Sequence, residues 1–483
     1  MIAALLLSLA LPDEEVTYSK HVAPILFKHC ASCHRPGEIG PFPLLEYKDA
    51  ARRAGHLREV TSEGRMPPWK AAPQEHRFRD ERRLTDEEKR TIARWADSGA
   101  KEGDPKDLPA LPKFPEGWQL GSPDVVLKMA KPFTVPATGR DVYRCFVIPI
   151  PTDGDKTVAA VEFRPGNPKV VHHAILYTDA LGQGRKKDPD GSGYASYGGP
   201  GILPTGGLGG WAPGATPRFL PEGMGLWLRK GSDLVLQVHY HPSGKEEQDQ
   251  SQVGVYFTKK PAERIVTGIA VASRGLYIPA GAKEHRVAAQ SEPLPVDANA
   301  VAIAPHMHMI GRKMKVAAAL PDGGSIQLID VQDWDFNWQG SYQYEKTVRL
   351  PKGTVIKLEA VYDNSKDNPQ NPSDPPKPVR WGEQTTDEMC LLGVQVVTDT
   401  AADLRQITAM RSARLGGALF GGSPGLDPKA FEDGIPIPER LKGLLGRYDK
   451  DNDGKIDDEE IDAMPPALKD RIRQLVPRKE GGN

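Results

Sequence analysis

The sequence has little cysteine, no surplus of either charge and no long apolar run. Four Cys among 483 residues exclude a disulfide-dense scaffold. Lys and Arg number 63 against 64 Asp and Glu, which argues against nucleic acid as the main partner because phosphate binding needs a basic surplus. No stretch provides the ~20 apolar residues of a transmembrane helix, so we expect no membrane span.

The N-terminus carries a short apolar segment. Residues 1–10 read MIAALLLSLA, too short for a bilayer span but similar to the apolar core of a secretory signal that ends in the small residues of a cleavage site. The usual preceding basic residues are missing, and a frayed apolar terminus is the alternative. We expect a signal segment at residues 1–12 and a periplasmic or secreted protein.

A haem-attachment motif follows. Cys30-Ala31-Ser32-Cys33-His34 has the CxxCH pattern, in which each thiol bonds one vinyl group of a c-type haem and the histidine binds the iron. A redox-active CxxC pair or half of a zinc site is the alternative, although no second pair of ligands follows nearby. Met66, in a loop stiffened by prolines, is the favoured sixth ligand, with His56 and His76 as rivals.

The rest of this region is typical of a small haem domain. Thr85–Glu88 is a capping box that predicts a helix ending near Gly99. Together with CxxCH and the Met66 loop, this helix makes residues 13–107 resemble a class I cytochrome c domain. One haem and no substrate-pocket motif imply electron transfer. The prolines after residue 103 predict an extended linker at 108–123.

From about residue 124 to 400 the pattern becomes that of β-structure. Short apolar runs are bounded by Gly, Pro, Asn and Asp, which predicts antiparallel β-sandwiches, and the length suits two of them. Gly and Pro, 49 and 45 residues, also favour turn-rich β-structure. The Gly-rich stretch 191–214 is predicted to be a long loop. The runs are 158–163, 234–239, 301–304 and 355–362.

Three histidine groups fall in or beside these runs. In a strand, residues i and i+2 share a face, so His306 and His308 can bind one metal, and so could His239 and His241. The adjacent pair His172-His173 needs a bulge, or binding through different ring nitrogens. Imidazole suits zinc, copper, iron and nickel, and a thioether ligand would favour copper. Surface or core histidines with satisfied hydrogen bonds are the alternative.

Four segments, in this order, resemble the signature segments of the copper type II, ascorbate-dependent monooxygenases, the family of peptidylglycine α-hydroxylating and dopamine β-monooxygenase. They are Val171–Ala174, Leu236–Pro242, His306–Lys313 and Asp387–Cys390, and the similarity spans roughly 120–400. The resemblance implies two jelly-roll-like β-sandwiches that face a solvent-filled cleft, with one copper each. It assigns His172, His173 and His239 to an electron-transfer copper, and His306, His308 and Met389 to a catalytic copper that binds dioxygen, with His241 outside the ligand set.

The sequence departs from the family at substrate and cysteine positions. The peptidylglycine enzyme binds its substrate carboxylate with an Arg two residues before HxH, and here that residue is Ala304. An Asn two residues after the Met is Leu391, so a peptide ending in glycine is not the expected substrate. The family disulfides are missing, and Cys145 and Cys390 are expected to be buried free thiols.

The C-terminal region contains a calcium-binding pattern. Residues 449–460 fit the 12-residue EF-hand loop, with Gly454 at the sharp turn and possible flanking helices at 441–448 and 468–475. An acidic solvated loop is the alternative, and a single loop favours a structural or docking role. The expected calcium ligands are Asp449, Asp451, Asp453, Lys455 through its carbonyl, Asp457 through water, and Glu460 as a bidentate ligand.

These features predict a multidomain protein. We expect a signal segment at 1–12, an α-helical cytochrome c domain at 13–107, a linker at 108–123, antiparallel β-sandwich copper domains at 124–258 and 259–400, and a small helical EF-hand tail at 401–483.

The expected function is that of an exported copper-dependent monooxygenase. It would hydroxylate a C–H bond of a small-molecule or peptide-like substrate with dioxygen, using electrons that an external donor supplies through the haem. The expected cofactors are two coppers, one haem c and one calcium per chain. A non-enzymatic periplasmic electron-transfer or copper-binding protein, or a calcium-dependent adhesion module, is the alternative.

Overall fold

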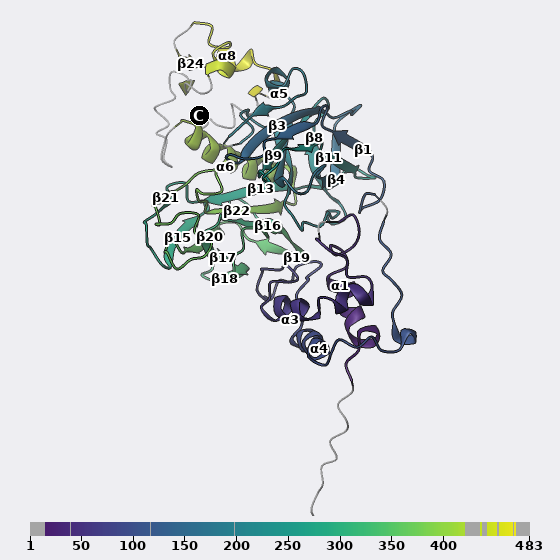
Figure 1. Cartoon of the computed structure of the whole chain (residues 1–483). Helices are drawn as coiled ribbons and strands as arrows, with labels where there is room; N and C mark the ends of the chain where they lie inside the picture. The colour runs from purple at the N-terminus through teal and green to yellow at the C-terminus, as the bar shows by residue number, and fades with distance from the viewer. Residues whose placement is uncertain are drawn as a thin grey trace, which may run out of the picture. The chain divides into compact units, whose positions relative to one another are not determined.

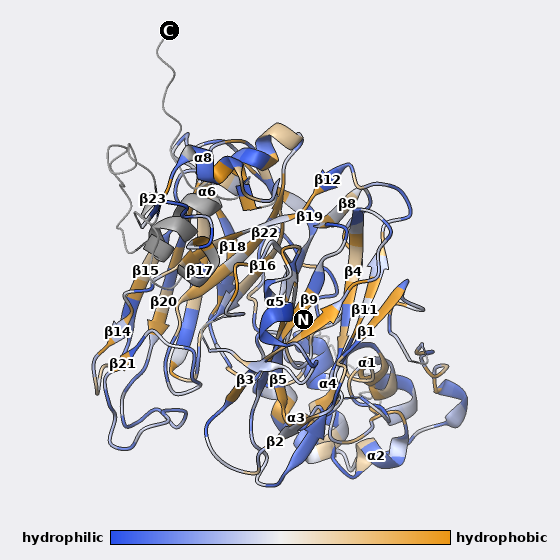
Figure 2. Cartoon of the chain, turned by 90° about the horizontal axis from the view of Figure 1, so that it is seen from above, coloured by the Kyte–Doolittle hydropathy of each residue, from blue (hydrophilic) through white to orange (hydrophobic). Residues whose placement is uncertain are grey.

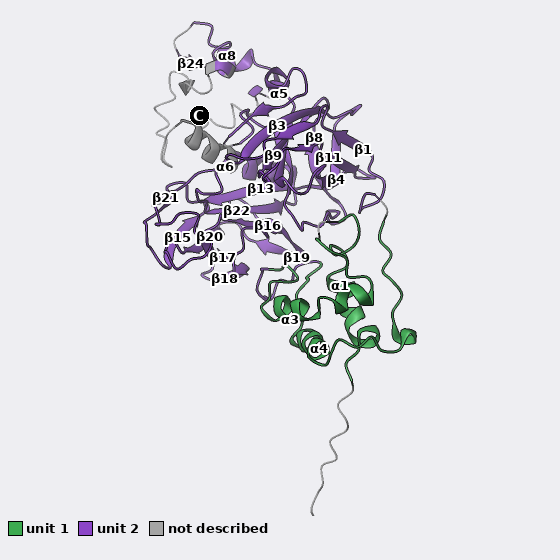
Figure 3. Cartoon of the chain, in the orientation of Figure 1, with its two compact units in different colours: residues 1–69, 80–116 green, residues 70–79, 117–483 purple. Residues whose placement is uncertain are grey.

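The computed structural model describes residues 15–38, 40–115, 117–197, 199–420, 435–436, 442–451, 454–466 and 468–469. The predicted signal segment lies outside these ranges. The chain divides into two compact units: residues 1–69 and 80–116 form unit 1, and residues 70–79 and 117–483 form unit 2 (Figure 3). The CxxCH motif belongs to unit 1, whereas the histidine groups and the EF-hand-like loop belong to unit 2.

Unit 1 is a small helical body. It contains the π-helix η1 (Tyr18–Val22), α1 (Ala23–His29), α2 (Tyr47–Ala51), α3 (Ala54–Ser62), α4 (Asp86–Asp97) and the 3-10 helix η2 (Pro105–Asp107). The predicted capping box starts α4: Glu88 N donates to Thr85 Oγ1 at 3.1 Å, and Thr85 N donates to Glu88 Oε2 at 2.8 Å. Ile92 and Trp95 bury one face of α4 in the core of the unit.

Unit 2 is rich in β-structure (Figure 1). Its first half contains β1 (Val125–Lys128), β2 (Phe133–Val135), β3 (Val142–Pro149), β4 (Lys156–Arg164), β5 (Val171–Asp179), α5 (Gln183–Lys187), β6 (Tyr194–Ala195), β7 (Gly206–Trp211), β8 (Met224–Leu228), β9 (Asp233–Tyr240), β10 (Glu247–Asp249), β11 (Gln252–Phe257) and β12 (Arg264–Ile265). Two five-stranded sheets, β1-β11-β4-β8-β12 and β6-β3-β9-β5-β7, share one apolar core. Every residue of β9 is buried, so this strand runs through the centre of the sandwich.

The second half of unit 2 has two four-stranded sheets. Its strands are β13 (Thr267–Ala272), β14 (Tyr277–Ile278), β15 (His285–Gln290), β16 (Ala298–His306), β17 (Gly311–Ala319), β18 (Ser325–Val331), β19 (Tyr342–Leu350), β20 (Val355–Tyr362), β21 (Val379–Arg380) and β22 (Leu391–Val397). The sheet orders are β13-β22-β16-β19 and β15-β20-β17-β18. Buried and more exposed residues alternate along β20, the period of two expected for a strand with one face on a core. Figure 2 shows apolar residues concentrated in such strands.

Residues 70–79 pair with two edge strands of this second half. Ala71 forms a β-bridge with Val331, and Phe78 forms one with Tyr344. These contacts supply backbone partners to β18 and β19, each at the edge of its sheet.

The prediction of one long loop over 191–214 was wrong, because β6 and β7 lie within it. β7 is an edge strand that pairs with β5 in antiparallel register. Glycine suits this strand because a Cβ at Gly210 would lie only 3.1 Å from the carbonyl oxygen of Ala174. Composition alone marked these glycines as loop residues.

The C-terminal region contains α6 (Ala401–Phe420), β23 (Ile435–Pro436), α7 (Lys442–Leu445), β24 (Lys455–Ile456) and α8 (Asp458–Asp462). β23 and β24 pair antiparallel, with Ile435 opposite Ile456. Of the possible helix at 468–475, residues 470–475 lie outside the described residues. In the part of the chain that the structure describes, no helix combines the length and apolar character needed to cross a membrane.

Candidate metal centres

Strands β5 and β9 bring the first three histidines together. Val171 pairs with Tyr240 and His173 pairs with His239, so β5 carries a bulge at His172. The bulge frees the two adjacent residues from the rule that neighbours point to opposite faces. The Nδ1 atoms of His172 and His173 lie 3.3 Å apart, as do those of His173 and His239.

These three side chains fit a single metal ion. One ligand atom from each lies within 4.8 Å of the other two. Around a tetrahedral metal with nitrogen bonds of ~2.0 Å, neighbouring nitrogens are about 3.3 Å apart. The spacing of the Nδ1 atoms therefore suits a transition metal such as copper. We call His172, His173 and His239 the first cluster.

His239 is fixed by two residues that the sequence analysis missed. Its Nε2 lies 3.1 Å from Oδ2 of Asp141, and its ring stacks on Tyr143 at 4.2 Å between centroids. A carboxylate beside Nε2 favours the tautomer with the hydrogen on Nε2, which leaves the lone pair of Nδ1 for the cluster. Asp141 also binds His241 Nδ1 at 2.8 Å and the hydroxyl of Thr385. Nothing in the sequence distinguished Asp141 from other acidic residues.

We expect removal of this carboxylate to weaken metal binding at the first cluster. Burial alone would raise the pKa of Asp141, but the hydrogen bonds from His239 and Thr385 outweigh it and hold the pKa well below its usual value. Asp141→Ala should therefore lower the copper affinity of this cluster about 10–100-fold. A competition titration with a Cu(I) chelator measures this loss, and Asp153→Ala, which removes an exposed carboxylate, is the matched control. Equal affinities for both variants would contradict the role given to Asp141.

The second cluster forms where β16 and β22 meet. His306 at the end of β16 is opposite Leu391 at the start of β22, and the ring centroids of His306 and His308 lie 5.1 Å apart. The backbone N–H groups of His308 and Met389 both donate to Oε1 of Glu388, the latter at 2.9 Å. The backbones of His308 and Met389 therefore lie close together. We call His306, His308 and Met389 the second cluster.

Both imidazoles of the second cluster are oriented by carbonyl oxygens. His306 Nδ1 donates to Gln339 Oε1 at 2.6 Å, and His308 Nδ1 donates to the carbonyl oxygen of Asp387 at 3.1 Å. Because these oxygens only accept, each Nε2 keeps the lone pair that a metal needs. Two imidazoles and a soft thioether are a donor set that suits Cu(I). Gln339 is another residue that the sequence analysis missed.

Glu388 anchors the backbone of the second cluster. It is fully buried, and its Oε2 accepts the N–H of Ile310 at 3.2 Å in addition to the two bonds to Oε1. Burial raises the pKa of Glu388 to about 8, which the hydrogen bonds from the backbone oppose. Sequence reasoning included Glu388 in a signature segment but gave it no role.

Burial keeps the five cluster histidines neutral. It lowers the pKa of His172 and of His308 to about 3 and that of His306 to about 4. The pKa values of His173 and His239 are also lowered by burial. All five imidazoles are therefore ready to bind a metal without first losing a proton.

The metal-free protein should lose stability as the pH falls below about 6.5. Histidines in the unfolded chain have a pKa near 6.5. Below that pH the unfolded chain therefore binds more protons than the folded chain, whose cluster histidines stay neutral. Each such histidine lowers the free energy of unfolding by about 1.4 kcal/mol per pH unit between that value and its folded pKa. Urea unfolding at pH 6 and pH 5 should show a steep loss, and His306→Gln should reduce the slope by about one proton. A slope that this substitution does not change would contradict the pKa assignment.

In unit 1 the CxxCH residues follow α1 in a tight turn. The backbone N–H groups of Cys33 and His34 both donate to the carbonyl oxygen of Cys30, at 3.1 and 2.8 Å. His34 Nδ1 donates to the carbonyl oxygen of Phe42 at 3.0 Å, which leaves Nε2 free. Glycine is required at position 40, because a Cβ there would lie 2.6 Å from the Cys33 carbonyl oxygen. These contacts are compatible with a haem axial histidine.

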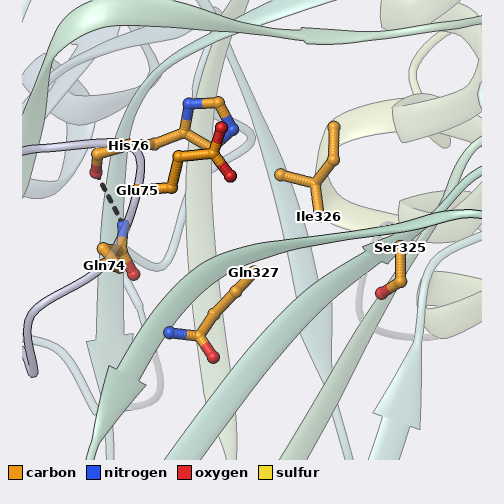
Figure 4. A pocket seen from close by; sticks show the side chains of 6 residues that line it. All are labelled: Gln74, Glu75, His76, Ser325, Ile326 and Gln327. Atoms are coloured by element: carbon orange, nitrogen blue, oxygen red, sulfur yellow. Dashed lines mark hydrogen bonds between the residues drawn. The ribbon is translucent and has the colours of Figure 1, made fainter.

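The three candidates for the sixth ligand of the haem lie at different places in the fold. Met66 lies in the loop after α3, where its N–H donates to the carbonyl oxygen of Val60 at 3.0 Å. His56 is exposed on α3. His76 lies in unit 2, where it lines a pocket of about 260 Å³ (Figure 4). The other residues of this pocket are Gln74, Glu75, Ser325, Ile326 and Gln327.

The EF-hand-like loop brings three acidic side chains together. Carboxylate oxygens of Asp449, Asp451 and Glu460 lie within 4.8 Å of one another. Gly454 turns the chain with a φ of +81°, a conformation that favours glycine, and its N–H donates to Asp449 Oδ2 at 3.1 Å. This arrangement can hold a calcium ion.

The other three predicted calcium ligands are not among these three side chains. Lys455 lies in β24, and Asp457 caps α8 by accepting the N–H of Glu460 at 2.8 Å. Asp453 lies outside the described residues.

One protein-family model matches part of the chain. Residues 265–398 match the C-terminal domain of the copper type II ascorbate-dependent monooxygenases. The matched range contains the whole second cluster, whereas the first cluster lies outside it. The match supports a copper monooxygenase-like function.

Other comparisons add no assignment. No curated protein sequence matches significantly. The major capsid protein P2 of bacteriophage PM2 is similar at a TM-score of 0.25 and 10% identity, over 56% of this chain and 96% of that chain. The STIV MCP is similar at a TM-score of 0.25 and 10% identity, over 58% of this chain and 96% of that chain. Infectious bursal disease virus VP2 is similar at a TM-score of 0.18 and 10% identity, over 59% of this chain and 73% of that chain. Likenesses this weak carry no argument about fold or function.

Proposed function

We propose that the protein is an exported copper-dependent monooxygenase that hydroxylates a C–H bond with dioxygen, and that a c-type haem in unit 1 supplies its electrons. The observation that carries this proposal is that His306 and His308 lie together at the end of β16, with the backbones of His308 and Met389 bound to the same Glu388 carboxylate, within the range that the family model matches. Two neutral imidazoles and a thioether in a buried setting are donors that suit a reactive copper.

The donor atoms of the two clusters differ, which suits them to different roles. Bound copper would supply one-electron redox chemistry and the activation of dioxygen. In the second cluster, Gln339 and the Asp387 carbonyl orient the imidazoles, and Glu388 holds the backbone that carries His308 and Met389. The first cluster has three imidazoles without a thioether, which suits storage and passage of an electron.

The reaction needs two electrons and two protons. Hydroxylation of a C–H bond places one oxygen atom of dioxygen in the alcohol and the other in water. Cys30, Cys33 and His34 would hold the haem, with Met66 as the favoured sixth ligand, and a bound haem would supply the electrons, which come from an external donor. The apolar N-terminus and the haem-attachment motif are the support for a periplasmic or secreted location.

The proposed substrate is a small molecule or a peptide-like compound without a C-terminal carboxylate to anchor. Ala304 replaces the arginine that binds that carboxylate in the peptidylglycine enzyme. Ala304 lies on β16, opposite Gly393 of β22, and neither residue offers a cation. The proposed calcium ion at Asp449, Asp451 and Glu460 has a structural role in the tail.

Labelled oxygen gas tests the proposal. The copper-loaded, haem-containing full chain is reduced and exposed to oxygen-18 with a panel of substrates that carry activated C–H bonds. We expect labelled alcohol in a copper-dependent reaction. If the metals are reoxidised by dioxygen and no product carries the label, the protein is an electron-transfer or copper-binding protein on the same scaffold.

A further inference from the structure

A loop outside every predicted site touches both clusters. Residues 332–341 connect β18 to β19 and contain three aromatic residues, Trp334, Phe336 and Trp338. Nothing in their spacing pointed to a metal site, because none of the three side chains is a usual metal ligand.

The ring of Phe336 contacts one histidine of each cluster. It stacks on His172 of the first cluster, with 4.7 Å between ring centroids and 20° between ring planes. It also meets His308 of the second cluster edge to face, at 5.9 Å and 76°. Both geometries are among those that aromatic pairs prefer. One half-buried side chain thus packs against both clusters.

Hydrogen bonds hold the loop in place on both sides of the Phe336 ring. Before it, Trp334 Nε1 donates to the carbonyl oxygen of His308 at 3.0 Å. After it, Gln339 Nε2 donates to the carbonyl oxygen of Phe336 at 3.0 Å, while Gln339 Oε1 accepts from His306. Lys70 also pairs with Asp333 at 2.8 Å. The position of the ring is therefore tied to the backbone and side chains of the second cluster.

We propose that Phe336 is a positioning residue that sets the separation of the two metal clusters and the orientation of His172. This inference rests on the proposed function, because it requires both clusters to bind copper. A hydrocarbon ring offers no donor atom, so it cannot bridge two metals as a ligand. Packed against His172 and His308, it keeps the clusters as two distinct single-metal centres at a fixed distance. Electron exchange between metals depends steeply on that distance.

Dipolar coupling between two Cu(II) ions tests this role directly, because it varies with the inverse cube of their separation. The full chain, loaded with two Cu(II) ions, is compared by EPR with Phe336→Leu and Phe336→Tyr. The leucine variant removes the ring, whereas the tyrosine variant keeps it. The wild type and Phe336→Tyr should show the same narrow distribution of dipolar couplings. In Phe336→Leu this distribution should become about twofold wider or more, because packing no longer fixes the positions of the histidine rings.

The outcomes separate this inference from the proposed function. Two bound coppers with the same narrow coupling in Phe336→Leu as in the wild type would overturn the positioning role and leave the monooxygenase proposal intact. A spread coupling in Phe336→Tyr as well would also overturn it, because the ring would then not be what matters. A wild-type chain that binds fewer than two coppers would defeat the proposed function and, with it, this inference.

Discussion

Replacing Met389 with alanine is expected to cost the second cluster its copper affinity and to abolish oxygen uptake. The thioether is the one soft ligand of that cluster, and the two imidazoles left behind hold Cu(I) less well. Loss of a direct ligand should lower affinity by at least the ~10–100-fold that loss of an outer partner costs. Oxygen consumption by the reduced, copper-loaded chain and a chelator titration measure the two effects.

Met307 provides the matched control for this substitution. It lies between His306 and His308 in sequence, and it is fully buried. Met307→Leu conserves volume, so we expect a loss of less than about 1.5 kcal/mol in stability and no loss of copper. If Met389→Ala retains substrate hydroxylation, or if both variants lose copper equally, Met389 is not the ligand.

Replacing Glu388 with glutamine is expected to disorganise the second cluster by a different route. The glutamine carbonyl oxygen can still accept the N–H groups of His308 and Met389, but the NH2 group that replaces the other carboxyl oxygen cannot accept the N–H of Ile310. A buried N–H left without a partner costs about 1–3 kcal/mol, so we expect a loss of stability of that size. The copper of the second cluster should be lost with it, as urea unfolding and metal analysis would show.

Glu162 offers a control with the same chemistry in the other sandwich. It is buried and accepts the backbone N–H groups of Gln119 and Leu120 at 2.8 and 3.1 Å. Glu162→Gln should lose a similar amount of stability and keep both coppers. Loss of copper from this variant as well would show that destabilisation alone empties the clusters, against the specific role of Glu388.

The approach of the strand histidines to one another could be anticipated because it depends on strand geometry. His306 and His308 are two residues apart at a strand end, and the adjacent pair His172-His173 was expected to need a bulge, which β5 has. Met389 required the register between β16 and β22, which no single-sequence pattern supplies. The assignment of Met389 to the same metal as His306 and His308 came from the family resemblance.

The residues that orient the clusters could not be anticipated. Asp141, Gln339 and Phe336 come from loops beside the strands, and their roles depend on contacts between segments far apart in sequence. An aspartate, a glutamine or a phenylalanine in a loop has many common uses, so residue type alone indicated none of these contacts. The prediction of a long loop over 191–214 was wrong for a related reason, because glycines in this range lie in an edge strand as well as in turns.

Copper stoichiometry tests the central claim, that two separate trios of side chains each hold one metal. The measurement compares the wild type with two triple variants, one carrying alanine at His172, His173 and His239, and the other carrying alanine at His306, His308 and Met389. We expect two coppers per chain in the wild type and one in each variant, with different EPR signals for the copper that remains. One copper or none in the wild type, or loss of both from either variant, would contradict the account.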